Sequence, residues 1–549
     1  MKLNLDFSKA WFLGGLIFVL GILAPNARAN VYAMNLRIDG GTTNIAANPG
    51  TNISISFRLN EPASLGTTVQ IRSGASVVSS LFFAPDSQGA LRGLNEVTWD
   101  GLGATGQPIP GGTYSVAIIP ASSGYTNWTQ ITSDTGDPNT LTSDGRGIAV
   151  DRNPASLYYG RIFVANSTIG TDPSGTPGDT VGILKFNADT STAEEGISSA
   201  DLDGYSWLGG GVSPWKLNVA VDDQVYVIDL AGGGLVNRWD PTISSNSVVP
   251  VLRQDNLPPG AALSGPALTG ASTNLQLWMA DTNMARVIKW SLTPGSVCAQ
   301  GDTGITVVSN TGPNFFDVAL DKNGNIYTCA FITAPGDPSP RVFRYPSYNP
   351  ALNNGLPQTN ADWAVGSSND TYAGASGIAV DPTSTYVAVA FEGPAGGFSP
   401  NGNTKILYAT NGAVAANIDL GLRIQNDPNH SDTDVSWDAV GNVYYIDFYW
   451  GNWRAFSPPG TNQSTTIAPA LIQLSGSPSI TKVTVSGSNI VLTFSGNASD
   501  AATAYTVLSS PTVTGTYANA NATITVQGPG VFQASVPKSG PTQFYRIRR

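Results

Sequence analysis

One strand-and-turn pattern recurs along the middle of the chain and constrains its fold more than any other feature. The clearest copy covers residues 314–345. An alternating apolar run at 316–320 leads into Asp321-Lys-Asn-Gly-Asn325, whose residues tolerate the positive φ angles of a tight hairpin. A second strand is expected at 326–331 and a third at 341–345. The copy therefore predicts a small antiparallel sheet.

Five further copies share two anchors, an apolar strand that ends in Asp and a second strand that ends in a small or acidic residue. The first anchors are Gly147-Ile-Ala-Val-Asp151, Leu217-Asn-Val-Ala-Val-Asp222, a degenerate copy at 265–269, Gly377-Ile-Ala-Val-Asp381 and Asp434-Val-Ser-Trp-Asp438. The second anchors begin at Phe163, Tyr226, Trp278, Val387 and Tyr444. Their spacing of roughly forty to sixty residues is typical of repeats that each form one four-stranded sheet.

Such a sheet cannot bury both of its faces alone. Stacking the copies around an axis buries them and leaves only short edges, so residues 145–462 are expected to form one closed six-bladed β-propeller. The two anchors and the Arg-led third strand resemble NHL-type propellers. This resemblance implies the fold but little about activity, because one fold carries many functions.

The segments on either side of the repeats carry their own strand patterns. Within residues 30–122, Asn95-Glu-Val-Thr-Trp99-Asp100-Gly101 is followed by Gly112-Thr-Tyr114, which resembles the FlgD-type immunoglobulin-like domain. Trp99 and Tyr114 are expected in the core of a small sandwich, with the turn at Asp100. Residues 463–549, with Tyr505 and the terminal Phe544-Tyr-Arg-Ile-Arg-Arg549, resemble fibronectin type III-like modules and predict a second sandwich.

Residues 123–144 form a polar linker. Two segments compete to supply the outer strand that closes the ring, residues 128–131 in this linker and residues 464–467 after the repeats.

The first residues have the composition of a secretory signal peptide. Lys2 and Lys9 precede an apolar run at 10–23, and Ala27-Arg-Ala29 offers the small residues of a cleavage site. We therefore expect residues 1–29 to be removed, no transmembrane segment in the mature chain, and a secreted product, extracellular or periplasmic.

Composition and charge narrow the class of partner. Charged residues make up 12% of the chain and the formal net charge is -11. Nucleic-acid binding rests on basic patches, so a nucleic-acid partner is not expected.

The chain has two cysteines, Cys298 and Cys329, in an expected oxidising compartment. They are candidates for a disulfide between neighbouring blades, with two buried free thiols as the alternative.

Polar and aromatic residues should converge where the chain enters each first strand and leaves each second strand, which we call the entry end. The candidate ligand-binding residues there are Arg146, Trp215, Asp229, Asp281, Glu392, His430, Asp432, Asp434, Tyr449, Trp450 and Trp453. Aromatic faces beside carboxylates suit sugars, and packing between blades is the competing interpretation.

Catalytic and metal-binding sets are sparse. His430 is the one histidine, and it lies in Asp427-Pro-Asn-His-Ser-Asp432, whose oxygens could hold Ca²⁺ or could cap turns in a solvated loop. Asp321, Asn323 and Asn325 superficially resemble a calcium loop but suit a hairpin turn better. No catalytic residue and no cofactor is assigned, with Ca²⁺ left open.

Two functions remain in competition. The first is a secreted, non-enzymatic binding or scaffold protein for an extracellular glycan or protein. The alternative is a propeller hydrolase or lyase that acts on extracellular polysaccharide through Asp residues at the entry end, since glycosidases need two carboxyl groups.

Overall fold

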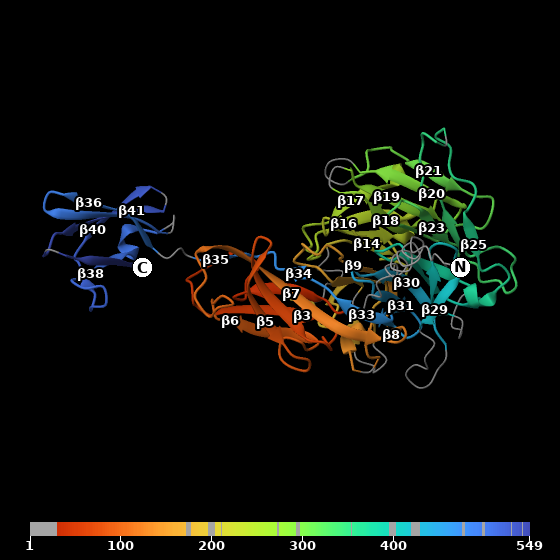
Figure 1. Cartoon of the computed structure of the whole chain (residues 1–549). Coiled ribbons are helices and arrows are strands. Elements are labelled where there is room, and N and C mark those ends of the chain that lie inside the picture. Colours follow the sequence, from red (N-terminus) through yellow and green to blue (C-terminus); the bar gives the residue numbers. More distant parts are fainter. Residues whose placement is uncertain are drawn as a thin grey trace, which may run out of the picture. The chain divides into compact units, whose positions relative to one another are not determined.

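The computed structural model describes residues 30–134, 136–171, 177–179, 181–195, 204–209, 211–271, 274–292, 297–352, 354–394, 402–418, 429–474, 478–496, 500–528, 530–540 and 542–549. Over these residues the chain is all-β, as predicted, with many small, mostly antiparallel sheets, a few short 3-10 helices and no α-helix (Figure 1). Nowhere in this part of the chain is there a helix long and apolar enough to cross a membrane. The expected signal peptide, residues 1–29, lies outside it.

The chain divides into two compact units. The first comprises residues 1–32, 121–153 and 158–464, and the second comprises residues 33–120, 154–157 and 465–549. The sequence repeats therefore fall almost entirely in the first unit.

Each predicted copy of the repeat corresponds to one small sheet of the first unit. The sheets contain β9 (Gly145–Val150), β10 (Arg161–Asn166) and β13 (Gly182–Asn187); β14 (Leu217–Val219), β15 (Val225–Asp229), β16 (Leu235–Trp239) and β17 (Val249–Leu252); β18 (Leu263–Thr269), β19 (Gln276–Asp281), β20 (Arg286–Ser291) and β21 (Ile305–Ser309). They continue with β22 (Asp317–Leu320), β23 (Ile326–Cys329), β24 (Val342–Tyr345) and β25 (Trp363–Val365); β26 (Ala375–Val380), β27 (Tyr386–Phe391), β28 (Thr404–Tyr408) and β29 (Val414–Ile418); β30 (Asp432–Trp437), β31 (Val443–Asp447) and β32 (Asn452–Ser457). A separate strand pair is β11 (Gly170–Thr171) with β12 (Pro177–Asp179).

The hairpins between first and second strands are built by their aspartates. Asp321 Oδ1 accepts hydrogen bonds from the backbone N–H groups of Asn323, at 2.8 Å, and Asn325, at 2.9 Å. Gly324 has a φ of +78°, which favours glycine. The carboxylate of Asp321 thus shapes the turn.

The first strands of the six sheets are neighbours in chain order, and β30 in turn contacts β9. Side chains at one repeat position link three of the neighbouring pairs of first strands. Asn218 Nδ2 donates to Pro266 O at 2.9 Å, Asp317 accepts from Ile378 N at 3.0 Å, and Asp434 accepts from Ile148 N at 2.9 Å.

The equivalent residue in the other three copies, Gly147, Gly265 and Gly377, is glycine, because the next strand approaches too closely for a side chain. A Cβ at Gly147 would lie 2.7 Å from Lys216 Cα, and one at Gly377 would lie 2.7 Å from Asp434 Cα. Backbone atoms cannot yield as a flexible side chain can.

The last sheet takes its fourth strand from the linker. β8 (Thr129–Gln130) pairs with β32 in antiparallel register, with Gln130 opposite Phe456, and Ile131 N donates to Ala455 O at 2.9 Å. The rival segment pairs elsewhere. Its strand β34 (Thr466–Ile467) lies beside β7 (Gly112–Tyr125). Of the two candidates, residues 128–131 therefore complete the sheet.

The second unit contains the two flanking modules. One sheet joins β1 (Ala33–Ile38), β3 (Ile53–Leu59) and β6 (Gly93–Trp99). Another joins β2 (Ile45–Ala47), β35 (Ile472–Leu474), β7, β4 (Thr67–Ser73) and β5 (Ser76–Phe83), with β34 also on β7. The last residues of β7, 121–125, belong to the first unit and pair there with β33 (Gly460–Gln463). Trp99 and Tyr114 are buried as expected. The remaining sheets are β36 (Ser479–Ser486), β37 (Asn489–Ser495), β41 (Val531–Pro537) and β40 (Thr523–Gly528), and β39 (Ala518–Asn519), β38 (Thr506–Ser510) and β42 (Phe544–Arg548).

This pairing corrects one predicted boundary. The sequence predicts that the C-terminal sandwich begins at residue 463. However, β34 and β35, which lie within residues 463–474, hydrogen-bond to β7 of the N-terminal module. The reason is that β7 offers an open edge along most of its length, which the returning chain covers.

The two cysteines are buried free thiols, so the disulfide candidate is wrong for this structure. Cys298 packs in one apolar cluster, with Trp290 and Leu292, and Cys329 packs in another, with Tyr327 and Val342.

Candidate functional site

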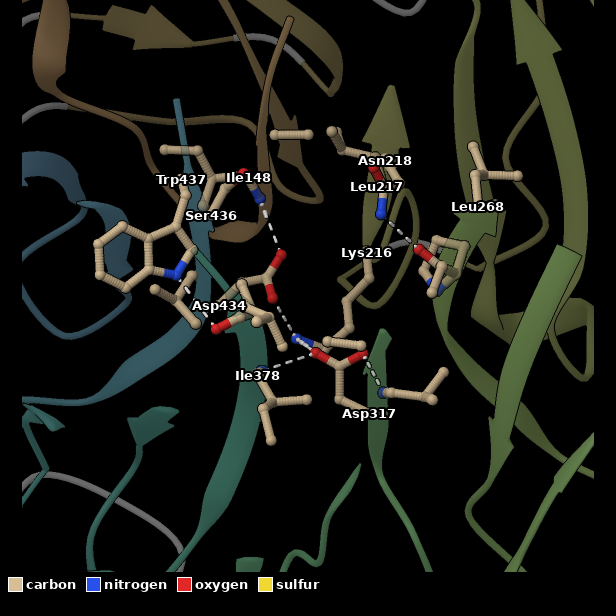
Figure 2. A pocket seen from close by; sticks show the side chains of 18 of the residues that line it. Ile148, Lys216, Leu217, Asn218, Leu268, Asp317, Ile378, Asp434, Ser436 and Trp437 are labelled. Atoms are coloured by element: carbon tan, nitrogen blue, oxygen red, sulfur yellow. Dashed lines mark hydrogen bonds and ion pairs between the residues drawn. The ribbon is translucent and has the colours of Figure 1, made fainter. Parts of the chain in front are cut away.

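The six first strands meet at a small cavity, which we call the central cavity (Figure 2). It has a volume of about 80 Å³ and is lined by residues of all six first strands. Organic ligands usually occupy pockets of about 300–1,000 Å³. The central cavity is therefore large enough for a few water molecules but not for an organic ligand.

An ion-pair cluster spans the central cavity. Figure 2 shows the Lys216 side chain reaching between Asp434 and Asp317. Lys216 Nζ lies 2.6 Å from Asp434 Oδ1 and 3.3 Å from Asp317 Oδ2, and it also donates to Thr433 O at 3.0 Å. Since each carboxylate also accepts a backbone N–H from the following sheet, this cluster ties several sheets together.

Burial and charge shift the pKa values of this cluster in a consistent direction. Burial opposes the charged ammonium of Lys216, but the charges of Asp317 and Asp434 outweigh it and raise the pKa above its ordinary value. Burial also raises the pKa of Asp317 and that of Asp434, while Lys216 opposes the shift. The cluster serves structure, because Asp434, predicted to bind a ligand, is buried and bonded to Lys216 and to Ile148 N.

The aspartates predicted to face a ligand are instead buried and hydrogen-bonded. Asp229 accepts from Leu208 N at 3.0 Å, and Asp281 accepts from Ala262 N at 3.2 Å. Asp432 accepts from the Thr404 hydroxyl at 2.7 Å. Asp229 and Asp281, at the ends of second strands, thus hold the chain that enters the first strand of the same sheet.

His430 and Trp453 are also buried, contrary to the prediction. His430 is 2% exposed, and its Nδ1 lies 3.6 Å from Asp447 Oδ2. The Trp453 indole donates to Asn139 O at 3.3 Å and packs 5.9 Å from the Phe186 ring. For Trp453 the competing interpretation, packing between sheets, therefore applies.

Of the other candidates, Arg146, Glu392, Tyr449 and Trp450 are half-buried, whereas Trp215 is buried. The Arg146 guanidinium lies 4.1 Å from the centre of the Phe448 ring and 5.2 Å from that of Trp215, which is buried. Arg146 also pairs with Asp144 at 3.1 Å. Tyr449 and Trp450 are half-buried, with ring centres 5.3 Å apart. We call Arg146, Glu392, Phe448, Tyr449 and Trp450 the entry cluster.

Glu392 differs electrostatically from the aspartates. Burial raises its pKa to about 7, although the charges of Arg146 and Lys216 oppose the shift. Its carboxyl group therefore exchanges a proton near neutral pH, as a general acid or base must.

A second, larger cavity lies at the end of the sheets opposite the entry end, where hairpins join the first and second strands. It has a volume of about 570 Å³ and is lined by Tyr125, Thr126, Trp128, Asp381, Thr383, Thr385, Tyr386, Trp437, Val440, Gly441, Pro458, Pro459 and Gly460. We call it the hairpin groove. This end therefore offers more than turn residues, because the linker residues Tyr125 and Trp128 line the cavity together with the hairpins.

Sequence reasoning missed Lys216, Asp317 and the hairpin groove. A lysine next to an apolar strand, in Trp215-Lys-Leu217, and an aspartate at the position that is glycine in other copies were available signals. The groove had no such signal, because its wall combines residues far apart in the sequence.

The calcium possibility concerns residues that the structure describes only in part. Asp427 lies outside the described residues, whereas Asp432 is buried. Within the described ranges, no three or more His, Cys, Asp and Glu side chains are grouped so as to hold a metal ion.

Comparison with known proteins gives little further information. No family model and no curated protein sequence matches this chain. Similar solved structures include the iodide structure of a Trichoderma reesei protein of Carbohydrate-Active Enzymes Family AA12, with a TM-score of 0.35, 9% identity and coverage of 60% of this chain and 98% of that chain. The calcium structure of that family has a TM-score of 0.34 and 10% identity, over 60% and 97%. Likeness at this level says nothing about what the present chain binds or catalyses.

Proposed function

We propose that this chain is a secreted, non-enzymatic binding protein whose residues 145–462, completed by β8, form a six-bladed β-propeller flanked by two small sandwiches. The neighbouring order of the six first strands and the contact of β30 with β9 support a closed ring. The partner in this proposal is an extracellular glycan or protein.

One observation carries the non-enzymatic role. The aspartates that an enzyme could use at the entry end, Asp229, Asp281 and Asp432, are buried and engaged in hydrogen bonds. Hydrolysis of a glycosidic bond needs two carboxyl groups beside the substrate. The entry cluster contains a single carboxyl group, that of Glu392, so it lacks the pair that this hydrolysis needs.

The test is to incubate the full chain with a panel of oligosaccharides and to follow binding by calorimetry and product release by mass spectrometry. We use cellohexaose, laminarihexaose, xylohexaose, mannohexaose and hexagalacturonate. Binding without shortened or unsaturated products is expected. Release of such products in proportion to protein would overturn the non-enzymatic role.

Glu392 favours a second candidate, the hydrolase or lyase acting on polysaccharide. A carboxyl group with a pKa of about 7 is suited to acid or base catalysis. Asp144, another carboxyl group at the entry end, is paired with Arg146 at 3.1 Å. If products are released and Glu392→Gln abolishes the release while melting at an unchanged temperature, this candidate replaces the first.

A further inference from the structure

We propose that the hairpin groove, and not the entry cluster, is the binding site for an uncharged oligosaccharide. This inference rests on the proposed binding function and names the place and the chemical class of the ligand. Its first support is size. A volume of about 570 Å³ falls within the range of about 300–1,000 Å³ that ligand pockets occupy.

The groove presents aromatic rings that the fold leaves partly uncovered. The Trp128 ring lies 6.0 Å from Tyr386 and 6.0 Å from Trp437, both in edge-on contact. Trp128 and Tyr386 are half-buried, whereas Trp437 is buried and its indole donates to Ala379 O at 3.1 Å. In the described part of the chain, the side chains of Trp128 and Tyr386 make no hydrogen bond, so their N–H and O–H groups can bind a ligand.

The rings continue as a row beyond the groove. Tyr386 and Tyr408 are directly opposite on β27 and β28, with ring centres 5.6 Å apart, and Tyr408 is 42% exposed. Trp128, Tyr386 and Tyr408 thus offer successive apolar surfaces. Such a row fits an extended chain of rings better than a single small molecule.

The lining carries no charge that a charged ligand could pair with. Among the described residues that line the groove there is no Lys, Arg or Glu, and Asp381 is the one acid. Asp381 Oδ1 accepts from Thr385 N and Tyr386 N, both at 2.6 Å, and its Oδ2 accepts from Thr383 N at 2.9 Å. Because its own turn occupies this carboxylate, the ligand is expected to be neutral.

Hydroxyl groups supply the polar part of the wall. The Thr383 hydroxyl bonds to that of Thr385 at 2.7 Å, and Thr385 is exposed. A ligand with apolar ring faces and many hydroxyl groups matches rings beside threonines. A neutral saccharide has both features.

The experiment measures binding of the full chain to the four neutral hexasaccharides, with hexagalacturonate as the charged control and hexaproline as a probe for a proline-rich peptide. Trp128→Ala removes the central ring, and Val440→Arg narrows the groove and adds a cation. Trp450→Ala, in the entry cluster, is the matched control. Each variant is first checked for an unchanged circular dichroism spectrum.

A neutral hexasaccharide is expected to bind, Trp128→Ala and Val440→Arg each to weaken binding about 10- to 100-fold, and Trp450→Ala to leave it unchanged. Loss of saccharide binding in Trp450→Ala alone would overturn the assignment of the ligand to the hairpin groove, while the proposed binding function would stand. Binding of only hexagalacturonate or hexaproline would overturn the ligand class. If none of the probes binds, the assignment of the groove to a neutral saccharide fails, whereas the proposed binding function, which includes a protein partner, is not overturned. Product release would overturn the non-enzymatic role alone.

Discussion

Lys216 shows how a single side chain can hold several repeats together. It is buried, and its ammonium is compensated by Asp317 and Asp434, which lie on two other sheets. A buried ion pair adds little net stability, because desolvation offsets the attraction, but removal of one partner leaves an uncompensated charge.

Substitution of Lys216 by Met is therefore expected to reduce the free energy of unfolding by about 3 to 5 kcal/mol at pH 7. The loss should be smaller near pH 4, where the two carboxyl groups can take up protons. Urea unfolding at both pH values measures it. Lys322→Met is the control, since Lys322 is exposed. Equal stability of Lys216→Met and the natural chain at pH 7 would contradict the role of the cluster.

Glu392 makes the stability depend on pH. Its pKa is raised to about 7, so its contribution to stability is complete below the ordinary pKa of about 4.5 and is lost as the pH rises through 7. Glu392→Gln removes this dependence. Relative to the variant, the natural chain should melt at progressively lower temperature from pH 5 to pH 8. A difference in melting temperature that stays constant over this interval would show that the pKa is not raised.

At the scale of the element, the hairpin aspartates differ widely in their burial and in the number of hydrogen bonds that they accept. Asp438 is buried and accepts hydrogen bonds from Val440 N, Gly441 N and Asn442 N at 2.8–3.0 Å. Asp222, at the same repeat position, is exposed and accepts one long bond from Gln224 N at 3.4 Å. The same motif thus has different energetic weight in different sheets.

Asp438→Ala should lower the free energy of unfolding by about 2 to 4 kcal/mol, because several backbone donors lose their acceptor in a buried turn. Asp222→Ala is its matched control and should change stability by no more than about 0.5 kcal/mol. Chemical denaturation of the two variants compares them directly. Similar losses for both would show that the burial of the turn does not matter.

The short strand β8 can be tested through one hydrogen bond. Ile131→Pro removes the N–H that donates to Ala455 O. It is expected to lower stability by about 1 to 3 kcal/mol, through the lost bond and the altered chain direction. Thermal melting measures the effect, with Asn127→Pro, at an exposed residue before the strand, as control. An unchanged melting temperature for Ile131→Pro would mean that β8 does not support the last sheet.

At the scale of the whole molecule, the chain returns to its N-terminal module after the repeats. β34 and β35 pair with β7, and the Thr466 hydroxyl donates to Ala33 O at 2.8 Å. Strands from before and after the repeats therefore form one module together.

A chain that stops after Leu474 keeps these strands, whereas one that stops after Gln463 loses them. We expect the N-terminal module to remain folded in the first and to become sensitive to protease in the second, because β7 then has an open edge. Limited proteolysis with mass mapping of residues 33–120 distinguishes them. Equal resistance of the two truncated chains would restore the boundary at 463.

The sequence by itself determined the local elements of this protein. Strand alternation and turns such as Asp321–Asn325 depend on neighbours in the chain. The first and second strands of every copy, and the burial of Trp99 and Tyr114, could therefore be predicted from residue patterns. The two flanking strand-rich segments were equally visible.

Only the tertiary structure decided which side chains are available to a ligand. Asp229, Asp281 and Trp453 have the chemistry of a binding site, but backbone donors and rings from distant segments bury them. The hairpin groove arises where the linker residues Tyr125 and Trp128 meet hairpins of the last two sheets, more than two hundred residues away in the sequence. Burial and pairing across such separations depend on how sheets pack, which no local pattern encodes.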